Sequence, residues 1–320
     1  MKFPSFVFLF LIVTQHSFAE DTADNAVNFK TSANLGFRTF NFEQNFDQGA
    51  LLVNGNTFAQ PAKRTADYTV DFKSVELTMA LAWRQIYATL NYETSIDTQL
   101  GTYDASYTPL SGGNPPSHGE ASFDFKRNDY ALTVGWNVID NFSLFTGYKA
   151  GKTDTSRPAT TYDPNLNQSI QSNATTTFKE DGPFIGASYS WIIGHGTLTF
   201  SSAWAYMNGN FQSAGEEVII DHKPPPVNTD YALTQQALNY NGHTNGLSFN
   251  LSWNVQATNN IGYYYGAKYQ RYNFDANTDV TWKFYDRNAL PATIYTIQGP
   301  GSVKNTETVT AFYAGVNYTF

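Results

Sequence analysis

Eight ionisable residues occupy the same side of alternating apolar and polar segments, and they are the first candidates for chemistry. They are Lys30, Arg38, Glu76, Glu93, Arg127, Asp129, Lys149 and Lys268. Both signs of charge are present, so ion pairs are expected wherever these side chains meet. Such a group can stiffen a closed interior through paired charges, or it can line a selective polar path for small solutes.

Histidine is the usual general base, and beyond the first 19 residues it occurs at positions 118, 195, 222 and 243. A water-activating aspartate site requires an Asp-x-His arrangement, and the chain contains no such triplet. His222 directly follows Asp221, so on an extended segment these two side chains point to opposite faces. A Gly-x-Ser-x-Gly motif is also absent. A Ser–His pair formed through space stays open, but we predict no catalytic residue.

Two segments place oxygen-bearing side chains at alternate positions, as calcium ligands often are. These segments are Asp163–Asn167 and Asp275–Asp279. Both lack the glycine at loop position six and the glutamate at position twelve that a calcium loop uses. Asp and Asn are also common turn formers, so we interpret both segments as turns and predict no metal and no cofactor.

Alternation with period two runs through most of the chain and predicts β-strands. Ten runs are predicted: Asn28–Glu43, Tyr68–Trp83, Ile86–Ser95, Ala121–Asn137, Asn141–Thr153, Thr175–Ile192, Gly196–Phe211, Asn245–Val255, Asn260–Asp275 and Thr306–Phe320. Aromatic residues lie near the ends of five of them: Trp83, Trp136, Trp191, Trp253, Tyr318 and Phe320. An indole is apolar but has a polar N–H, so rings at one depth suit the boundary between hydrocarbon and head groups. We predict that these six residues form a membrane-interface girdle.

The connections between the runs alternate between short and long. The short ones follow the tryptophans, and the long ones cover about 45–67, 98–119, 154–173, 212–244 and 276–305. Membrane barrels combine short periplasmic turns with long extracellular loops, and an even strand count puts both termini in the periplasm. Residues 280–284 and 293–297 also alternate, which predicts an external hairpin extending the last two strands and makes twelve strands less favoured. All prolines except Pro4 and Pro183 fall in the predicted loops, and Pro183 is predicted at a bend near the outer rim.

Composition excludes several classes of protein. The chain has no cysteine, which excludes disulfides and thiolate chemistry. Its net charge is −8 and it has no basic stripe, so nucleic acid is not expected as a partner. Beyond the first residues no stretch approaches the ~20 apolar residues of a membrane-spanning helix, which excludes a helical inner-membrane protein. A secreted all-β enzyme is the soluble alternative.

The first 19 residues predict a cleaved signal peptide. Lys2 supplies the positive end, 6–13 is a short apolar stretch, and Ser17 and Ala19 are small residues at the −3 and −1 positions. Cleavage after Ala19 would leave 20–320 as a single barrel domain.

These features together resemble those of Gram-negative outer-membrane β-barrels. The final run, from Phe312 to Phe320, resembles the β-signal that the barrel-assembly machinery reads, with a terminal aromatic residue and apolar residues at alternate positions before it. The resemblance implies an all-β, antiparallel, up-and-down transmembrane barrel in the bacterial outer membrane, surrounded by lipid and lipopolysaccharide. It selects no family, and ten tall strands are similar to omptin proteases in size only.

The predicted function is non-enzymatic: a narrow pore for small polar solutes, or a surface barrel with a structural or binding role. Ten strands lie near the eight that leave room only for side chains, which favours the paired network over an open path. The aromatic residues Trp282, Phe284, Tyr285 and Tyr295 of the last long loop suggest an extracellular ligand at the loops. The alternative is an outer-membrane enzyme, an omptin-like protease or a lipid-modifying barrel, with its site at the extracellular rim.

Overall fold

A computed structural model describes residues 27–48, 51–53, 56–59, 62–96, 99–109, 117–163, 168–221, 231–286 and 293–320. The predicted signal peptide lies outside the described residues. The strands are β1 (Val27–Gln48), β2 (Leu51–Val53), β3 (Asn56–Ala59), β4 (Ala62–Trp83), β5 (Ile86–Ser95), β6 (Gln99–Pro109), β7 (Ser117–Ile139), β8 (Phe142–Asp163), β9 (Gln168–Ile193), β10 (Gly196–Asp221), β11 (Tyr231–Gln256), β12 (Ile261–Asp286) and β13 (Thr293–Thr319). The described residues form no helix that is long and apolar enough to cross a membrane.

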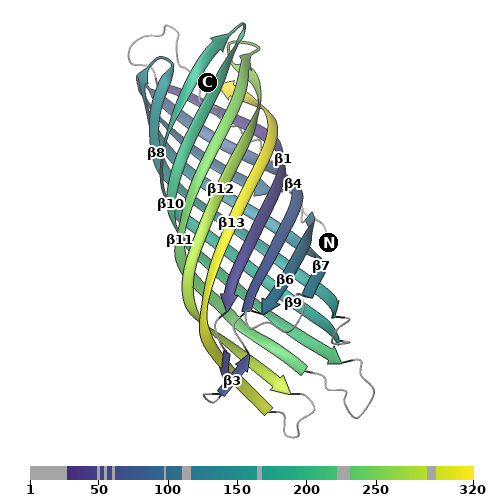
Figure 1. The fold of residues 1–320 in the computed structure, drawn as a ribbon. Coiled ribbons are helices and arrows are strands. Elements are labelled where there is room, and N and C mark those ends of the chain that lie inside the picture. The colour runs from purple at the N-terminus through teal and green to yellow at the C-terminus, as the bar shows by residue number, and fades with distance from the viewer. Residues whose placement is uncertain are drawn as a thin grey trace, which may run out of the picture.

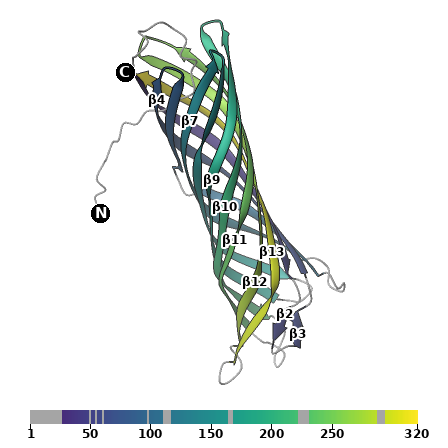
Figure 2. The same cartoon turned by 90° about the vertical axis from the view of Figure 1, so that its left-hand side faces the viewer.

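The strands close into one antiparallel barrel. Neighbours along the chain pair with each other, and β1 also pairs with β13, which completes the ring. Strands β5 and β6 share one position in the wall, since both pair with β4 and with β7. The wall therefore has ten strands, as predicted, and Figures 1 and 2 show them tilted around a tall, narrow body.

The wall is taller than the sequence predicts. Strand β10 continues to Asp221 and β11 begins at Tyr231, within a segment that we predicted as a long loop. Strands β12 and β13 pair up to Asp286 and Thr293, which confirms the predicted extension of the last two strands. The small β2–β3 hairpin lies outside the wall, near the end opposite the C-terminus (Figure 1).

Two predictions about the prolines are wrong: that those other than Pro4 and Pro183 lie in loops, and that Pro183 lies near the outer rim. Pro109, Pro158 and Pro300 lie within strands rather than in loops. Pro183 lies in the middle of β9 and not near the outer rim. The ladder with β10 has pairs at Phe184 and at Asp181 but none at Gly182 and Pro183, because proline has no N–H to donate.

The outer face carries an apolar band at the end of the barrel where the C-terminus lies (Figure 1). On β7 the exposed residues of this band are Tyr130, Leu132, Val134 and Trp136. Farther from the tight turn, the exposed positions of the same face are Lys126 and Asp124. The change at Tyr130 marks the outer boundary of the hydrocarbon, because charged side chains are costly on a lipid-facing surface.

Along the barrel axis, the inner face is polar where the outer face is apolar, and apolar where the outer face is polar. Next to the apolar band the interior is polar, with buried residues such as Ser74, Thr78 and Thr133. Beyond the band it becomes apolar, and one buried cluster there consists of Phe40, Phe42, Val70, Phe72, Phe123, Phe125, Phe178, Phe211, Tyr240, Phe274, Ala276, Val303 and Val309. We call this cluster the aromatic core, the part of the barrel around it the outer section, and the part within the apolar band the membrane section.

Candidate functional site

Strand alternation carries the eight predicted ionisable residues to the inside of the barrel. Seven of them gather in two groups beneath the aromatic core, and the eighth, Lys30, does not. Lys30 is buried near the tight-turn end, opposite Ala80 and Thr319 in the ladder, and it forms no ion pair with a described residue.

The first group joins Arg38 and Lys268 to Glu76 and Glu93. Lys268 Nζ lies 3.8 Å from Glu76 Oε2 and 3.4 Å from Glu93 Oε2. Arg38 Nη2 lies 3.6 Å from Glu76 Oε2 and also pairs with Glu93. Asn91 donates to Glu76 over 3.1 Å. Two cations thus meet two carboxylates, and the group is formally neutral.

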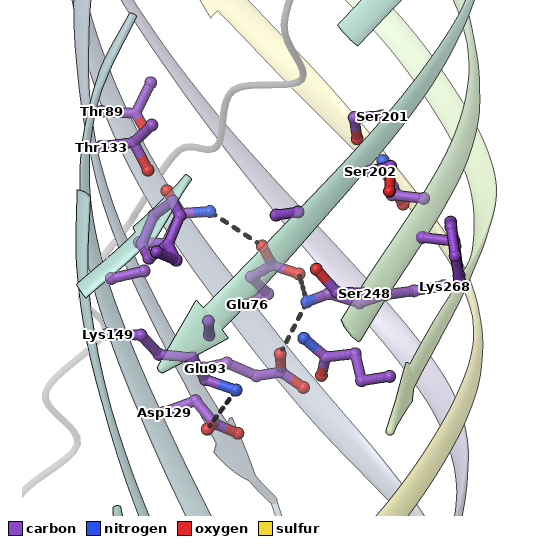
Figure 3. Close-up of a pocket in the computed structure, with 18 of the residues that line it drawn as sticks. Glu76, Thr89, Glu93, Asp129, Thr133, Lys149, Ser201, Ser202, Ser248 and Lys268 are labelled. Carbon is purple, nitrogen blue, oxygen red and sulfur yellow. Dashed lines mark hydrogen bonds and ion pairs between the residues drawn. The ribbon is translucent and has the colours of Figure 1, made fainter. Parts of the chain in front are cut away.

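The second group is centred on Arg127. Its guanidinium contacts Asp129 at 2.6 Å, Glu180 at 3.4 Å and Glu307. Lys149 Nζ lies 3.5 Å from Asp129, beside which it stands in Figure 3, and 4.0 Å from Glu180. Two cations face three carboxylates, so this group keeps a formal charge of −1.

Lys149 has an additional aromatic partner. It donates to the hydroxyl oxygen of Tyr272 over 2.8 Å, and its Nζ lies 4.2 Å from the centre of that ring. Tyr272 also accepts a hydrogen bond from Gln270. The second group is therefore held from several strands, and no single strand determines its geometry.

The sequence analysis missed Glu180 and Glu307, which are 2% and 1% exposed. Strand alternation also predicts that both side chains face inward. Trp191 faces outward on β9 and Phe320 ends the outward series of β13, and counting back by two from either passes over the glutamate. The signal for both glutamates is the alternation at the ends of these strands that lie far from the outward aromatic residues.

The aromatic core lies directly against the second group. Arg127 Cζ lies 5.7 Å from the centre of the Phe40 ring, which is within cation–π range. Phe40 and Phe125 have ring centres 4.7 Å apart, and Phe125 and Phe72 are 5.0 Å apart. Phe40 and Phe125 are 1% and 0% exposed. Among the described residues, packed aromatic side chains therefore occupy the lumen next to the ion pairs.

A cavity of about 240 Å³ lies in the membrane section, and the charged groups form part of its lining. Lys268, Lys149, Glu76, Glu93 and Asp129 line it together with hydroxyl-bearing residues, of which Figure 3 labels Thr89, Thr133, Ser201, Ser202 and Ser248. A cavity of this polarity is suited to water or a small polar solute. The lining contains no histidine, so it lacks the usual general base.

Tyr87 is buried inside the barrel between this cavity and the tight turns. It fits because Gly135 faces it across the strand pair, where a Cβ would lie 2.0 Å from the tyrosine ring. The Tyr87 hydroxyl lies 3.3 Å from Ser143 Oγ, which lies 2.6 Å from Ser188 Oγ. The membrane section is thus narrowed by packed side chains on both sides of the cavity.

The histidines do not meet in the part of the chain that the structure describes. His195 lies in the turn after Gly194, and His243 lies on the outer face, 5.3 Å from the Tyr206 ring. His222 and the side chain of His118 lie outside the described residues. No group of three or more His, Asp or Glu residues that could hold a metal occurs among the described positions.

The structure describes only one of the two segments with oxygen-bearing side chains that we predicted as turns. Asp275–Asp279 belongs to β12 and is not a turn, and Asp275 Oδ2 lies 3.9 Å from Lys304 Nζ. Asp163 ends β8, while residues 164–167 lie outside the described part of the chain. Residues 282–285 and 295–297 are also in strands rather than in a loop, but their side chains are outside the description.

The aromatic girdle residues lie together at the tight-turn end. Trp83, Trp136 and Trp191 are exposed on the outer face, and Trp253 is half-buried. Tyr318 and Phe320 have ring centres 4.8 Å apart. These rings border the apolar band on the side of the C-terminus, as interface aromatics do in membrane barrels.

No known protein family and no curated protein matches this chain. Among solved structures, the outer membrane protease OmpT from Escherichia coli is similar at a TM-score of 0.59 and 14% identity, covering 95% of this chain and 100% of OmpT. A FadL homologue from Pseudomonas aeruginosa gives a TM-score of 0.32 at 11% identity, covering 90% of each chain. At such identities a likeness shows the fold alone. The fold, the apolar outer band and the aromatic girdle make this chain a β-barrel of the Gram-negative outer membrane.

Proposed function

We propose that the protein is a non-enzymatic, closed barrel that does not conduct solutes and that exposes its tall outer section for a structural or binding role. The observation that carries this proposal is the aromatic core. A conducting lumen needs continuous water, and the rings of Phe40, Phe125 and Tyr240 are 0–1% exposed. Beneath them the Arg127 group pairs its charges across the interior, which favours a stiffening role over a path for ions.

Reconstitution into planar lipid bilayers tests the closed state. The wild-type barrel is expected to give no stepwise currents at either polarity, because the aromatic core leaves no water column through the outer section. A bacterial porin reconstituted in the same bilayers serves as the positive control. Stepwise currents from the wild type would overturn the closed state and would favour the other function considered, a narrow pore whose selective part is the charged cavity.

The enzyme alternative predicts a different result. Purified barrel in lipid, incubated with a mixed peptide library and with phospholipid, is expected to leave both unchanged. The reason is that neither His195 nor His243 forms a hydrogen bond with a described aspartate, although Asp275 lies opposite His243 on the outer face. His243→Ala is expected to behave like the wild type. Cleavage of a peptide or lipid that His243→Ala abolishes would establish a rim enzyme and remove the non-enzymatic proposal.

A further inference from the structure

The outer surface at the tight-turn end contains a hollow between two girdle tryptophans. Its volume is about 650 Å³, within the usual range for small-molecule sites, and it lies in the apolar band. The walls are Ile86, Val134, Leu144 and Ile185, which are 45–59% exposed, together with Trp83 and Trp136. In the membrane this surface faces lipid, so a hollow here receives part of a lipid molecule.

A small outward residue, Thr146, makes room for the hollow. Thr146 lies opposite Val134 on one side and Ile185 on the other, and it is much shorter than its neighbours along the outer face. Its hydroxyl donates to the carbonyl oxygen of Phe184 over 2.8 Å, so its polar atom is already satisfied. The floor of the hollow is therefore apolar in character and matches an acyl chain.

One basic residue stands at the head-group end of the hollow. Arg84, in the turn between β4 and β5, lines the hollow, and its Cζ lies 4.8 Å from the centre of the Trp83 ring. The next residue, Gln85, accepts a hydrogen bond from Trp136 Nε1 over 3.2 Å. The turn thus contacts both tryptophans and places a guanidinium at the tight-turn end of the hollow.

The tight turn determines the backbone conformation of Arg84. Its φ is 54°, and it is the single non-glycine residue with positive φ among the described positions. Gly194 has a φ of 58° at the same position of the β9–β10 turn, so this conformation belongs to the tight hairpin, and here the hairpin contains an arginine instead of a glycine. Asp140 and Asn141 occupy the equivalent positions in the next tight turn, and no other described tight turn contains lysine or arginine.

We propose that this hollow binds one anionic glycerophospholipid, with an acyl chain along Val134, Leu144 and Ile185 and its phosphate on Arg84. Interfacial arginine provides charge complementarity to an anionic head group, and the flanking indoles fix the depth. The proposal goes beyond the closed-barrel function and is independent of whether the lumen conducts.

Native mass spectrometry of the detergent-solubilised barrel tests the site with phosphatidylglycerol and phosphatidylcholine of identical acyl chains. The wild type is expected to retain one phosphatidylglycerol with an affinity about five-fold higher than that for phosphatidylcholine. Arg84→Gln is expected to reduce phosphatidylglycerol to the phosphatidylcholine level. Thr146→Trp fills the hollow and is expected to weaken retention of both lipids.

Ala314→Trp is the matched control, because Ala314 is an exposed small residue of the outer face on β13, away from the hollow. It is expected to leave retention of both lipids unchanged, and heat-modified gel migration verifies that every variant is folded. Equal retention of the two lipids by the wild type would overturn the proposal. A second result would also overturn it: Arg84→Gln loses the preference for phosphatidylglycerol, but Thr146→Trp has no effect. The arginine would then attract the head group without an acyl chain bound in the hollow.

Discussion

Replacing Arg127 with methionine is expected to lower the free energy of unfolding by about 3–5 kcal/mol. Arg127 is 4% exposed and pairs with the carboxylates of Asp129, Glu180 and Glu307. Its removal leaves Lys149 as the sole cation of this group against three carboxylates, of which Glu180 and Glu307 are buried. A buried charge that loses its partner keeps the cost of desolvation without the Coulombic attraction that offsets it.

Lys152→Met is the matched control for this change. Lys152 Nζ also forms an ion pair, 2.7 Å from Asp154 Oδ2, but its side chain is 45% exposed on the outer face of β8. Exposed pairs contribute at most about 1 kcal/mol, so a small effect is expected. Urea unfolding in lipid vesicles, followed by tryptophan fluorescence, measures both variants under the same conditions.

A third variant separates lost charge pairing from lost packing. Adding Glu180→Gln and Glu307→Gln to Arg127→Met removes the orphaned charges with the cation, and it is expected to recover a large part of the lost stability. A cost for Arg127→Met that is no larger than that of Lys152→Met would contradict a stabilising network in the lumen.

The ten-stranded wall and its inward charges could be predicted because a strand has a period of two. Trp136 marks the outward face of β7, and Asp129 lies an odd number of residues before it, so the two must face opposite sides. The strand count follows from the turns in the same way. Arg84 and Gln85 directly follow Trp83 and leave room only for a hairpin between β4 and β5.

Strand runs longer than a membrane crossing predict that the barrel rises above the membrane, but the aromatic core of the outer section could not be predicted, for a reason that lies in the same periodicity. Thr39, Phe40, Asn41 and Phe42 alternate just as a lipid-spanning segment does, yet here the phenylalanines face inward. Alternation separates two faces, but it does not indicate which face meets lipid, water or a core. The apolar residues change from the outer face to the inner face because the wall is taller than the membrane. The outer section stands in water and must bury its apolar residues.

Which residues pair with each other also could not be predicted from the sequence. Arg127 and Glu307 are 180 positions apart, and they meet because the barrel closes with a particular stagger between strands. The cavity depends in the same way on which side chains face each other across the lumen. Tyr87 fills the lumen near the turns because Gly135 stands opposite, and alternation alone does not reveal that match.

Replacing Phe125 with alanine is expected to destabilise the barrel by about 3–5 kcal/mol, the range for removing a buried phenylalanine ring. Phe125 is fully buried and packs against Phe40 and Phe72 in the aromatic core. Urea unfolding in lipid vesicles measures the loss. The matched control is Lys126→Ala, the next residue of the same strand, which is exposed on the outer face.

Lys126→Ala is expected to change the free energy of unfolding by no more than about 0.5 kcal/mol, as for most surface substitutions. The two variants are adjacent on one strand, so the difference between them measures which face of the outer section is the core. In the membrane section the large apolar side chains face lipid instead, and the interior holds charges and hydroxyl groups. Similar costs for Phe125→Ala and Lys126→Ala would mean that the interior beyond the apolar band is not packed. The lumen could then be continuous with water, and the closed state would lose the observation on which it depends.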